Sequence, residues 1–282
     1  MPDDVVSPGV YKATYARAPF IFGMARARAL PGPVLVALMT VLEGTPAANK
    51  ALLHRMVEGG SLTLTRVGRV GVYGMAGRLL TGFTAIRGDG SLRSSGWDGR
   101  FHALVYDIPE SRRRDRDRFL MAAFQVGYRS MRPGVLISPT DESHHLPATD
   151  LGLQSAWMTF PEDETPALVE RVWRLDAFRA EYEGAIAQVE RCLTRPLEKL
   201  EGPDALRLLF EAVSPHTALL LRDGALPLEL RPEGWPAGRL LAVVEEAERR
   251  LAPAASAYVN EQVSGSPYAD LVEADEYRPP NL

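Results

Sequence analysis

Apolar residues in the first third of the chain recur at helical spacing and then alternate, which predicts helices followed by a hairpin. Residues 15–23 form a short apolar segment that predicts a first helix, ended by the prolines of residues 29–33. The run Val34–Leu42 is apolar almost all round, which predicts a buried helix or strand, and its setting favours a helix. Residues 46–58 follow as an amphipathic helix, with Thr45 as its cap and Pro46 in its first position.

The amphipathic helix has a clear division into two faces. Its apolar face carries Leu52, Leu53, Met56 and Val57, and its other face carries Lys50, Ala51, His54 and Arg55. Residues 62–66 then alternate as a strand, residues 67–69 turn, and residues 70–73 return. This order predicts a winged helix-turn-helix over residues 1–92, with duplex DNA as the partner.

Five basic side chains are the candidate DNA contacts. Lys50, His54 and Arg55 lie on the polar face of the predicted recognition helix, and Arg66 and Arg69 lie on the hairpin. Glycines recur every third residue from Gly68 to Gly77. They favour either a wing backbone that approaches the phosphate chain or a plain tight hairpin, and the sequence leaves both open.

The middle of the chain changes to short strands. Residues 81–96 are rich in glycine and serine and predict a linker. Strands are expected at residues 101–108, 128–131, 135–138 and 154–160, with a helix at 111–126 and a helical or irregular piece before the last strand. The order β-α-β-β-α-β predicts a ferredoxin-like domain over residues 93–162.

The last part of the chain, residues 163–282, reads as a helical C-terminal domain. Apolar residues recur at helical spacing, and helices are expected over 204–213 and 237–258, followed by a polar tail. The expected fold class is therefore α+β, with a winged-helix head, a ferredoxin-like middle and a helical end.

Charge is distributed unevenly along an otherwise ordinary globular composition. The net charge is −4, yet residues 1–100 hold 12 Lys+Arg against 6 Asp+Glu, and residues 101–282 hold 20 against 30. A basic head on an acidic body is typical of a DNA reader carried by a sensing or dimerising body. The N-terminus lacks the pattern of a secretory signal, and Val34–Leu42 is far too short to span a membrane, so a cytoplasmic protein is expected.

Several motifs in the middle and C-terminal parts point to one family. They read Trp97-Asp98-Gly99-Arg100-Phe101, Leu104 to Glu110, Gly134 to Pro139, Trp173-Arg174-Leu175-Asp176, and Leu230-Arg231-Pro232 with Trp235-Pro236. The chain resembles the PaaX family, the transcriptional repressors of phenylacetate degradation. The resemblance implies a homodimeric repressor of a catabolic operon that binds near-palindromic operators. It also implies release by an acyl-coenzyme A thioester.

The head departs from the family pattern at two places. Asn49 lies near the middle of the Leu52/Met56 face, where related repressors have an apolar residue. Gly60-Ser61 stands where a Gly-Trp pair usually precedes the wing.

Five arginines crowd the first turns of the helix expected at 111–126, where the helix dipole disfavours positive charge. Glu110, Asp115 and Asp117 can pair with some of them. The alternatives are such a solvated network, a phosphate-bearing ligand, and an interdomain or dimer contact. Arg112, Arg113 and Arg116 are the candidate effector contacts. Trp173, Phe178 and Tyr182 either wall the apolar end of that ligand or form ordinary core.

A metal-dependent nuclease is the rival interpretation. Asp107 ends the first strand of the middle domain, and CRISPR-associated spacer-acquisition proteins of this fold place an aspartate in a similar position, where it can hold a metal. No converging ligands can be named beside Asp107. His144 and His145 beside Asp141 and Glu142 could suggest a metal, but they are interpreted as a solvated loop, because adjacent side chains diverge on a helix. We expect no catalytic residue, metal or cofactor, and expect the single cysteine, Cys192, to be packed in a helix.

Overall fold

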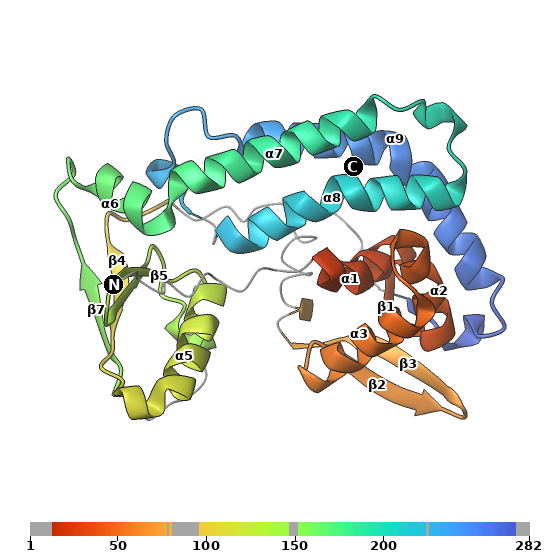
Figure 1. The fold of residues 1–282 in the computed structure, drawn as a ribbon, viewed down its shortest axis with the longest axis horizontal. Coiled ribbons are helices and arrows are strands. Elements are labelled where there is room, and N and C mark those ends of the chain that lie inside the picture. The colour runs from red at the N-terminus through yellow and green to blue at the C-terminus, as the bar shows by residue number, and fades with distance from the viewer. Residues whose placement is uncertain (1–12, 78, 81–95, 147–151, 224–225, 275–282) are drawn as a thin grey trace. The chain divides into compact units, whose positions relative to one another are not determined.

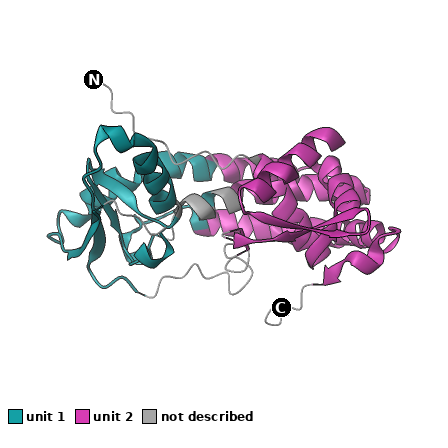
Figure 2. Ribbon diagram, turned by 90° about the horizontal axis from the view of Figure 1, so that it is seen from below, with its two compact units in different colours: residues 1–10, 93–183, 219–237 teal, residues 11–92, 184–218, 238–282 magenta. Residues whose placement is uncertain are grey.

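The computed structural model describes residues 13–77, 79–80, 96–146, 152–223 and 226–274 of the chain, and it contains helices and two antiparallel sheets. This mixture confirms the α+β class. The chain divides into two compact units (Figure 2): residues 1–10, 93–183 and 219–237 form unit 1, and residues 11–92, 184–218 and 238–282 form unit 2. Within the described residues, none of the helices has both the length and the apolar character to span a bilayer.

Unit 2 begins with three helices and a hairpin gathered around a small sheet (Figure 1). The elements are α1 (Ala13–Ala25), β1 (Ala27–Pro31), α2 (Gly32–Leu42), α3 (Pro46–Glu58), β2 (Leu62–Val67) and β3 (Val70–Met75). The sheet has the order β2-β3-β1-β8, where β8 is Glu273–Ala274. The predicted helices and hairpin are therefore present. The linker predicted at residues 81–96 lies outside the described residues, except for residue 96.

Local sequence patterns do not predict strands β1 and β8. Residues 29–33 were expected only to break a helix, but β1 pairs antiparallel with β3, with Leu30 opposite Tyr73. The expected polar tail returns to the same sheet, where Ala274 lies opposite Ala27. β1 contains no β-branched or aromatic residue, since it reads Ala-Arg-Ala-Leu-Pro, and β8 has only two residues, so only pairing with distant residues defines them.

The rest of unit 2 is helical. It contains the end of α7 (Leu175–Leu193), η3 (Leu197–Lys199), most of α8 (Gly202–Asp223), most of α9 (Ala237–Ser264) and η5 (Ala269–Leu271). Helix α8 packs on the head: the rings of Phe20 and Phe210 meet edge to face at 5.1 Å, and Arg207 Nε donates to the Val41 carbonyl at 3.1 Å. The predicted burial of Cys192 is confirmed.

Helices α8 and α9 extend past the ends that the sequence predicted. Each contains a proline, Pro215 in α8 and Pro253 in α9. A proline in a helix removes one backbone hydrogen bond. Burial continues across it, since Leu251 and Ala255 on either side of Pro253 are both buried. The continuous apolar face therefore outweighs the lost hydrogen bond.

Unit 1 is built on a four-stranded antiparallel sheet of order β5-β6-β4-β7. Its elements are β4 (Phe101–Val105), η1 (Glu110–Arg112), α5 (Arg113–Gln125), β5 (Arg129–Arg132), β6 (Val135–Ser138), η2 (Ser143–His145), β7 (Gln154–Met158), α6 (Thr165–Trp173), the start of α7, the end of α8 and η4 (Leu228–Leu230). Between β6 and β7 the described residues form only the η2 turn, and residues 147–151 lie outside the described part.

Both faces of this sheet are covered. Facing α5, the buried cluster includes Leu104, Phe119, Ala123, Tyr128 and Leu136. On the other face, Phe101, Ala103, Val135 and Ile137 pack with residues of α6 and η4. Trp173, Phe178 and Tyr182 are all buried, so of the two alternatives for these aromatic residues the structure favours ordinary core.

His216 of α8 makes the stability of unit 2 depend on pH. The side chain is 9% exposed, and this burial lowers its pKa to about 4 from 6.5. Between pH 4 and pH 6.5, His216 is therefore protonated in the unfolded chain and neutral in the folded chain. The contribution of His216 to the free energy of unfolding should be fully present above pH 6.5 and should fall by roughly 3 kcal/mol as the pH drops to 4.

Urea unfolding at pH 7.5 and pH 5 tests this expectation in the native protein and in His216→Gln. The variant should lose less stability between the two pH values than the native protein, whatever its absolute stability. An exposed histidine, His54, provides the matched control substitution, His54→Gln. If the native protein and His216→Gln lost the same unfolding free energy between pH 7.5 and pH 5, His216 would not be the source of this pH dependence.

Candidate nucleic-acid interface

Helix α3 presents a basic arc to the surface. Its start is fixed by Thr45, whose Oγ1 accepts a hydrogen bond from the Ala48 amide at 3.2 Å, as predicted. Lys50, His54 and Arg55 are all exposed. At 100° per residue they fall within one arc of the helix, opposite the buried face. The side chain of His54 also lies 3.4 Å from that of Glu58, measured from Nε2 to Oε1.

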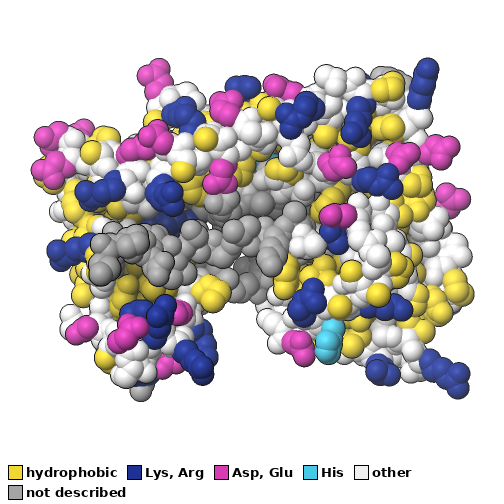
Figure 3. All heavy atoms as spheres, in the orientation of Figure 1, with side chains coloured by type: hydrophobic (Ala, Val, Ile, Leu, Met, Phe, Trp, Pro, Cys, Tyr) yellow, Lys and Arg dark blue, Asp and Glu magenta, His cyan; other side chains and the backbone are white. Residues whose placement is uncertain are grey.

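The β2–β3 hairpin that follows α3 projects from the packed part of its unit. In β2 only Leu62 is buried, while even the apolar Leu64 and Val67 are 41% and 47% exposed. Gly68 adopts φ +60° in the turn, a conformation that glycine adopts without strain, and Arg69 follows it at the tip. Arg66 and Arg69 are both exposed, and basic side chains lie over α3 and the hairpin (Figure 3).

Ser61 joins the helix to the hairpin through its backbone. Its amide donates to the Met56 carbonyl at 2.9 Å, and its carbonyl accepts from the Ala76 amide at 3.0 Å. The connection from α3 to β2 is therefore closed by main-chain hydrogen bonds. It does not depend on the large aromatic residue that the family pattern places here.

Asn49 is fully buried and belongs to a polar network beneath the basic arc. Its Oδ1 accepts from Arg17 Nη1 of α1 at 3.2 Å. Its Nδ2 donates to Thr40 Oγ1 and to the Glu43 carbonyl, each at 3.2 Å. Arg17 is itself 5% exposed, and its Nη2 pairs with the carboxylate of Glu43. One side chain of α3 is thus tied to α1, to α2 and to the turn between α2 and α3.

This network explains why a polar residue stands in an apolar face. A buried guanidinium without acceptors is strongly unfavourable, so Arg17 requires oxygen partners inside the head. Asn49 supplies one of them and satisfies its own amide at the same time. Arg17 and Asn49 therefore form a matched pair, a long-range relation that helical periodicity does not reveal.

The arginines at the start of α5 lie in a network of exposed ion pairs. Arg112 Nε lies 3.1 Å from Asp115, Arg116 Nη1 lies 2.9 Å from Glu110, and Arg113 lies 3.7 Å from Glu110 and 3.8 Å from Asp117. The predicted pairing with acidic neighbours is confirmed. Such exposed pairs contribute about 0–1 kcal/mol each, so a polyanionic ligand could displace them at small cost.

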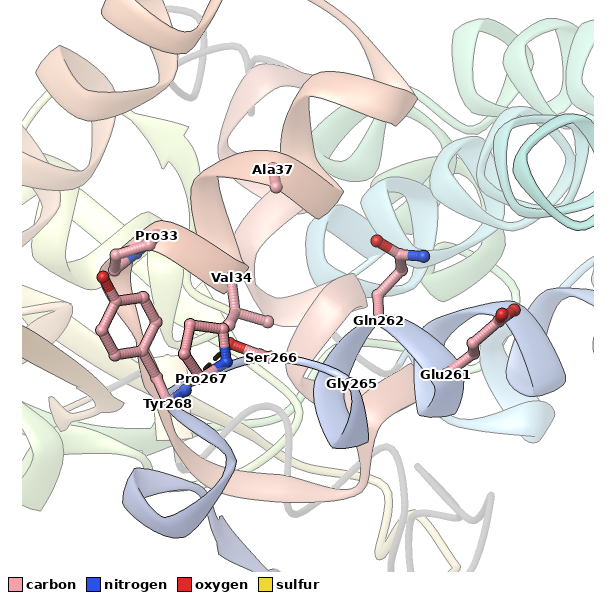
Figure 4. A pocket seen from close by; sticks show the side chains of 9 residues that line it. All are labelled: Pro33, Val34, Ala37, Glu261, Gln262, Gly265, Ser266, Pro267 and Tyr268. Atoms are coloured by element: carbon pink, nitrogen blue, oxygen red, sulfur yellow. Dashed lines mark hydrogen bonds between the residues drawn. The ribbon is translucent and has the colours of Figure 1, made fainter.

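A pocket of about 440 Å³ lies in unit 2 between the start of α2 and the end of α9 (Figure 4). Its lining comprises Pro33, Val34, Ala37, Glu261, Gln262, Gly265, Ser266, Pro267 and Tyr268. None of these side chains is cationic, and Glu261 is acidic. The pocket therefore does not suit the phosphates of a coenzyme A thioester.

Asp107 and the two adjacent histidines lie in different surroundings. Asp107 is exposed and lies two residues beyond the end of β4. Among the described residues it belongs to no group of three potential metal ligands, whereas Glu142, His144 and His145 form one. The expectation that the histidine rings diverge is wrong: their centroids are 4.0 Å apart. The two exposed rings lean against each other at the end of the short η2 turn.

In comparisons with known proteins, two parts of the chain match family models. Residues 94–164 match the family described as the PaaX protein central Cas2-like domain, and residues 173–261 match the PaaX-like protein C-terminal domain. No curated protein matches the chain. A solved structure, the uncharacterized protein Rv0674 from Mycobacterium tuberculosis, shares 20% identity and a TM-score of 0.51, covering 80% of this chain and 89% of that one. At this identity the likeness shows the fold alone.

A double-mutant cycle tests the pairing of Arg17 with Asn49. Asn49→Leu removes a buried acceptor of the guanidinium and should cost about 1–3 kcal/mol of unfolding free energy. Arg17→Met leaves the Asn49 carbonyl oxygen buried without its donor and should also destabilise. The double variant replaces both partners by apolar groups, so its loss should be clearly smaller than the sum of the two single losses.

Urea denaturation of the four proteins provides the measurement, and Ala51→Leu on the exposed side of α3 is the matched control. That variant should stay within about 0.5 kcal/mol of the native protein. Strict additivity of the two single losses, or a stabilising effect of Asn49→Leu alone, would contradict the pairing.

Proposed function

The chain belongs to the PaaX family, and on that premise we propose that it is a DNA-binding transcriptional regulator of a catabolic operon, acting as a repressor. Residues 1–92 are assigned as its winged helix-turn-helix head. The observation that carries the proposal is the exposed basic arc of α3, held from beneath by the Arg17–Asn49 network and followed directly by a projecting hairpin.

The proposed contacts divide into two kinds. Lys50, His54 and Arg55 enter the major groove and read base edges, because an α-helix fits that groove and the three side chains share its exposed arc. Arg66 and Arg69 on the hairpin contact phosphates, which position the head without reading sequence. Two heads of a homodimer, spaced by about one turn of DNA, would then read the two halves of a near-palindromic operator.

The other parts of the chain are assigned to the regulatory body. The strand order β5-β6-β4-β7, with all neighbours antiparallel and α5 between β4 and β5, supports a ferredoxin-like domain over residues 93–162. Residues 163–282 form the helical C-terminal domain in this proposal. Asp107 has no catalytic role in it.

The proposed effector is an acyl-coenzyme A thioester, and Arg112, Arg113 and Arg116 are its proposed phosphate contacts. These side chains are exposed or half-buried, and each pairs with a neighbouring carboxylate. Breaking such a pair to bind a phosphate would cost little free energy. Effector binding would lower the affinity for DNA, and DNA would lower the affinity for the effector by the same factor, because coupling between two sites is reciprocal.

Gel shifts with duplexes from the upstream region of the protein's own operon test DNA binding. Arg66→Gln and Arg69→Gln should lower the affinity for operator and random duplexes by the same factor. Each should also reduce the slope of log affinity against log salt concentration by about 0.9. Lys50→Gln and Arg55→Gln should instead reduce the preference for the operator over random DNA.

Arg132→Gln, at an exposed arginine on β5 of unit 1, is the matched control and should leave both affinities unchanged. The DNA-binding proposal would fail if no duplex were preferred over random DNA at moderate salt. It would also fail if Arg132→Gln weakened binding as much as the hairpin variants do.

Release from the operator by a panel of aryl- and alkyl-coenzyme A thioesters tests the effector. A thioester, and not the corresponding free acid, should release the native protein from the operator. The double variant Arg113→Gln with Arg116→Gln should need about tenfold more thioester for the same release, which corresponds to a loss of roughly 1.4 kcal/mol of ionic contacts. Exposed Arg114 on the same helix gives the control, Arg114→Gln. Release by free acids, or by no member of the panel, would refute the thioester while leaving the DNA-binding proposal intact.

A further inference from the structure

One cluster of side chains in unit 1 has no part in the proposed regulation. Glu142, His144 and His145 lie on and beside the η2 turn that follows β6, and each offers one possible ligand atom. We propose that these three residues bind a divalent late transition metal such as Zn²⁺, with water completing the coordination.

The distances between the ligand atoms fit such an ion. All three lie within 4.8 Å of one another, and His145 Nε2 is 3.5 Å from Glu142 Oε2. Zinc bonds of about 2.0–2.1 Å in a tetrahedron place neighbouring ligand atoms about 3.3 Å apart. One ligand pair is already at this spacing. The third ligand atom belongs to His144, an exposed side chain, and lies within 4.8 Å of the other two.

Hydrogen bonds around the cluster hold its carboxylate and its turn in place. Thr140 Oγ1 donates to Glu142 Oε1 at 3.2 Å, which leaves Oε2, the oxygen nearer His145, for the ion. Asp141 Oδ1 accepts from the Ser143 amide at 2.9 Å and from the Ser143 hydroxyl at 2.6 Å. Partners of this kind behind the ligands are what orients a protein metal site.

The same turn is anchored to the buried part of the sheet. Asp141 Oδ1 lies 3.5 Å from Nδ1 of His102, a buried residue of β4. That nitrogen is also 2.6 Å from the hydroxyl of Tyr128, which is fully buried. The ligands therefore extend from a turn that is braced against the core of unit 1.

The donor set selects the class of metal. Two imidazoles and one carboxylate suit zinc, nickel and cobalt ions, whereas magnesium and calcium favour sites made of oxygen alone. Because His144 and His145 are exposed, the ion would keep open positions toward solvent. The proposal concerns binding and does not require catalysis.

Equilibrium dialysis of the full chain, purified without a histidine tag, against Zn²⁺, Ni²⁺ or Co²⁺ tests the site. Metal analysis should find one ion per chain, and bound Co²⁺ should show the visible absorption of a site with nitrogen and oxygen ligands. The double change His144→Gln with His145→Gln should abolish this binding. Asp141→Ala, which removes the brace and leaves all three ligands, should weaken it by about tenfold.

His54→Gln is the matched control, because His54 and Glu58 are an exposed histidine–glutamate pair that belongs to no group of three potential ligands in the described part of the chain. It should leave the stoichiometry unchanged. Melting curves followed by circular dichroism should show that the variants at these exposed residues stay folded. The proposal is overturned if the native chain takes up no ion at micromolar free metal, or if the double histidine variant binds as much as the native chain.

Discussion

The head depends on one buried charge. Arg17 is almost fully buried, and acceptors for its two terminal nitrogens offset the unfavourable burial of its guanidinium, whose Nε has no hydrogen-bond partner. The acceptors come from Asn49 on α3 and Glu43 in the turn before α3, and Asn49 also holds Thr40 of α2. The three helices of the head are therefore fixed by a shared polar contact as well as by apolar packing. The direction in which α3 presents its exposed side follows from that contact.

The same constraint reaches the helices that follow in the chain. Val41 at the end of α2 accepts a hydrogen bond from Arg207 of α8, and Phe20 of α1 packs on Phe210 of the same helix. At the other edge of the head, β8 adds a strand to β1. Residues distant in sequence thus contact both the turn side and the sheet side of the head within unit 2. A displacement of α8 would alter its contacts at the end of α2, next to the turn that leads into α3.

Much of the head could be predicted from local patterns. Thr45, Pro46 and the spacing of Leu52 and Met56 define α3, and the alternation around Gly68 defines the hairpin, because caps, periodicity and turns act over a few residues. Strands β1 and β8 could not be found in this way, since each exists only through pairing with a distant partner.

The candidate sites were harder to predict, for the same reason. Asn49 looked like a departure from the family pattern, because its partner Arg17 lies 32 residues away in the chain. The histidines at 144 and 145 were expected to point apart, yet an exposed turn leaves side chains free to face each other. Ion pairing of the arginines around the start of α5 could be predicted as one alternative, because acidic partners stand at helical spacing.

Crosslinking from defined positions to operator DNA tests the central claim most directly, namely that the exposed side of α3 lies against the duplex. A photoreactive residue at Ala51, in the middle of the basic arc, should crosslink to the operator in high yield and to the major-groove side of the bases. The same residue at Met121, which is exposed on α5 of unit 1, should give no crosslink. Crosslinking from position 121 with none from position 51 would contradict the account.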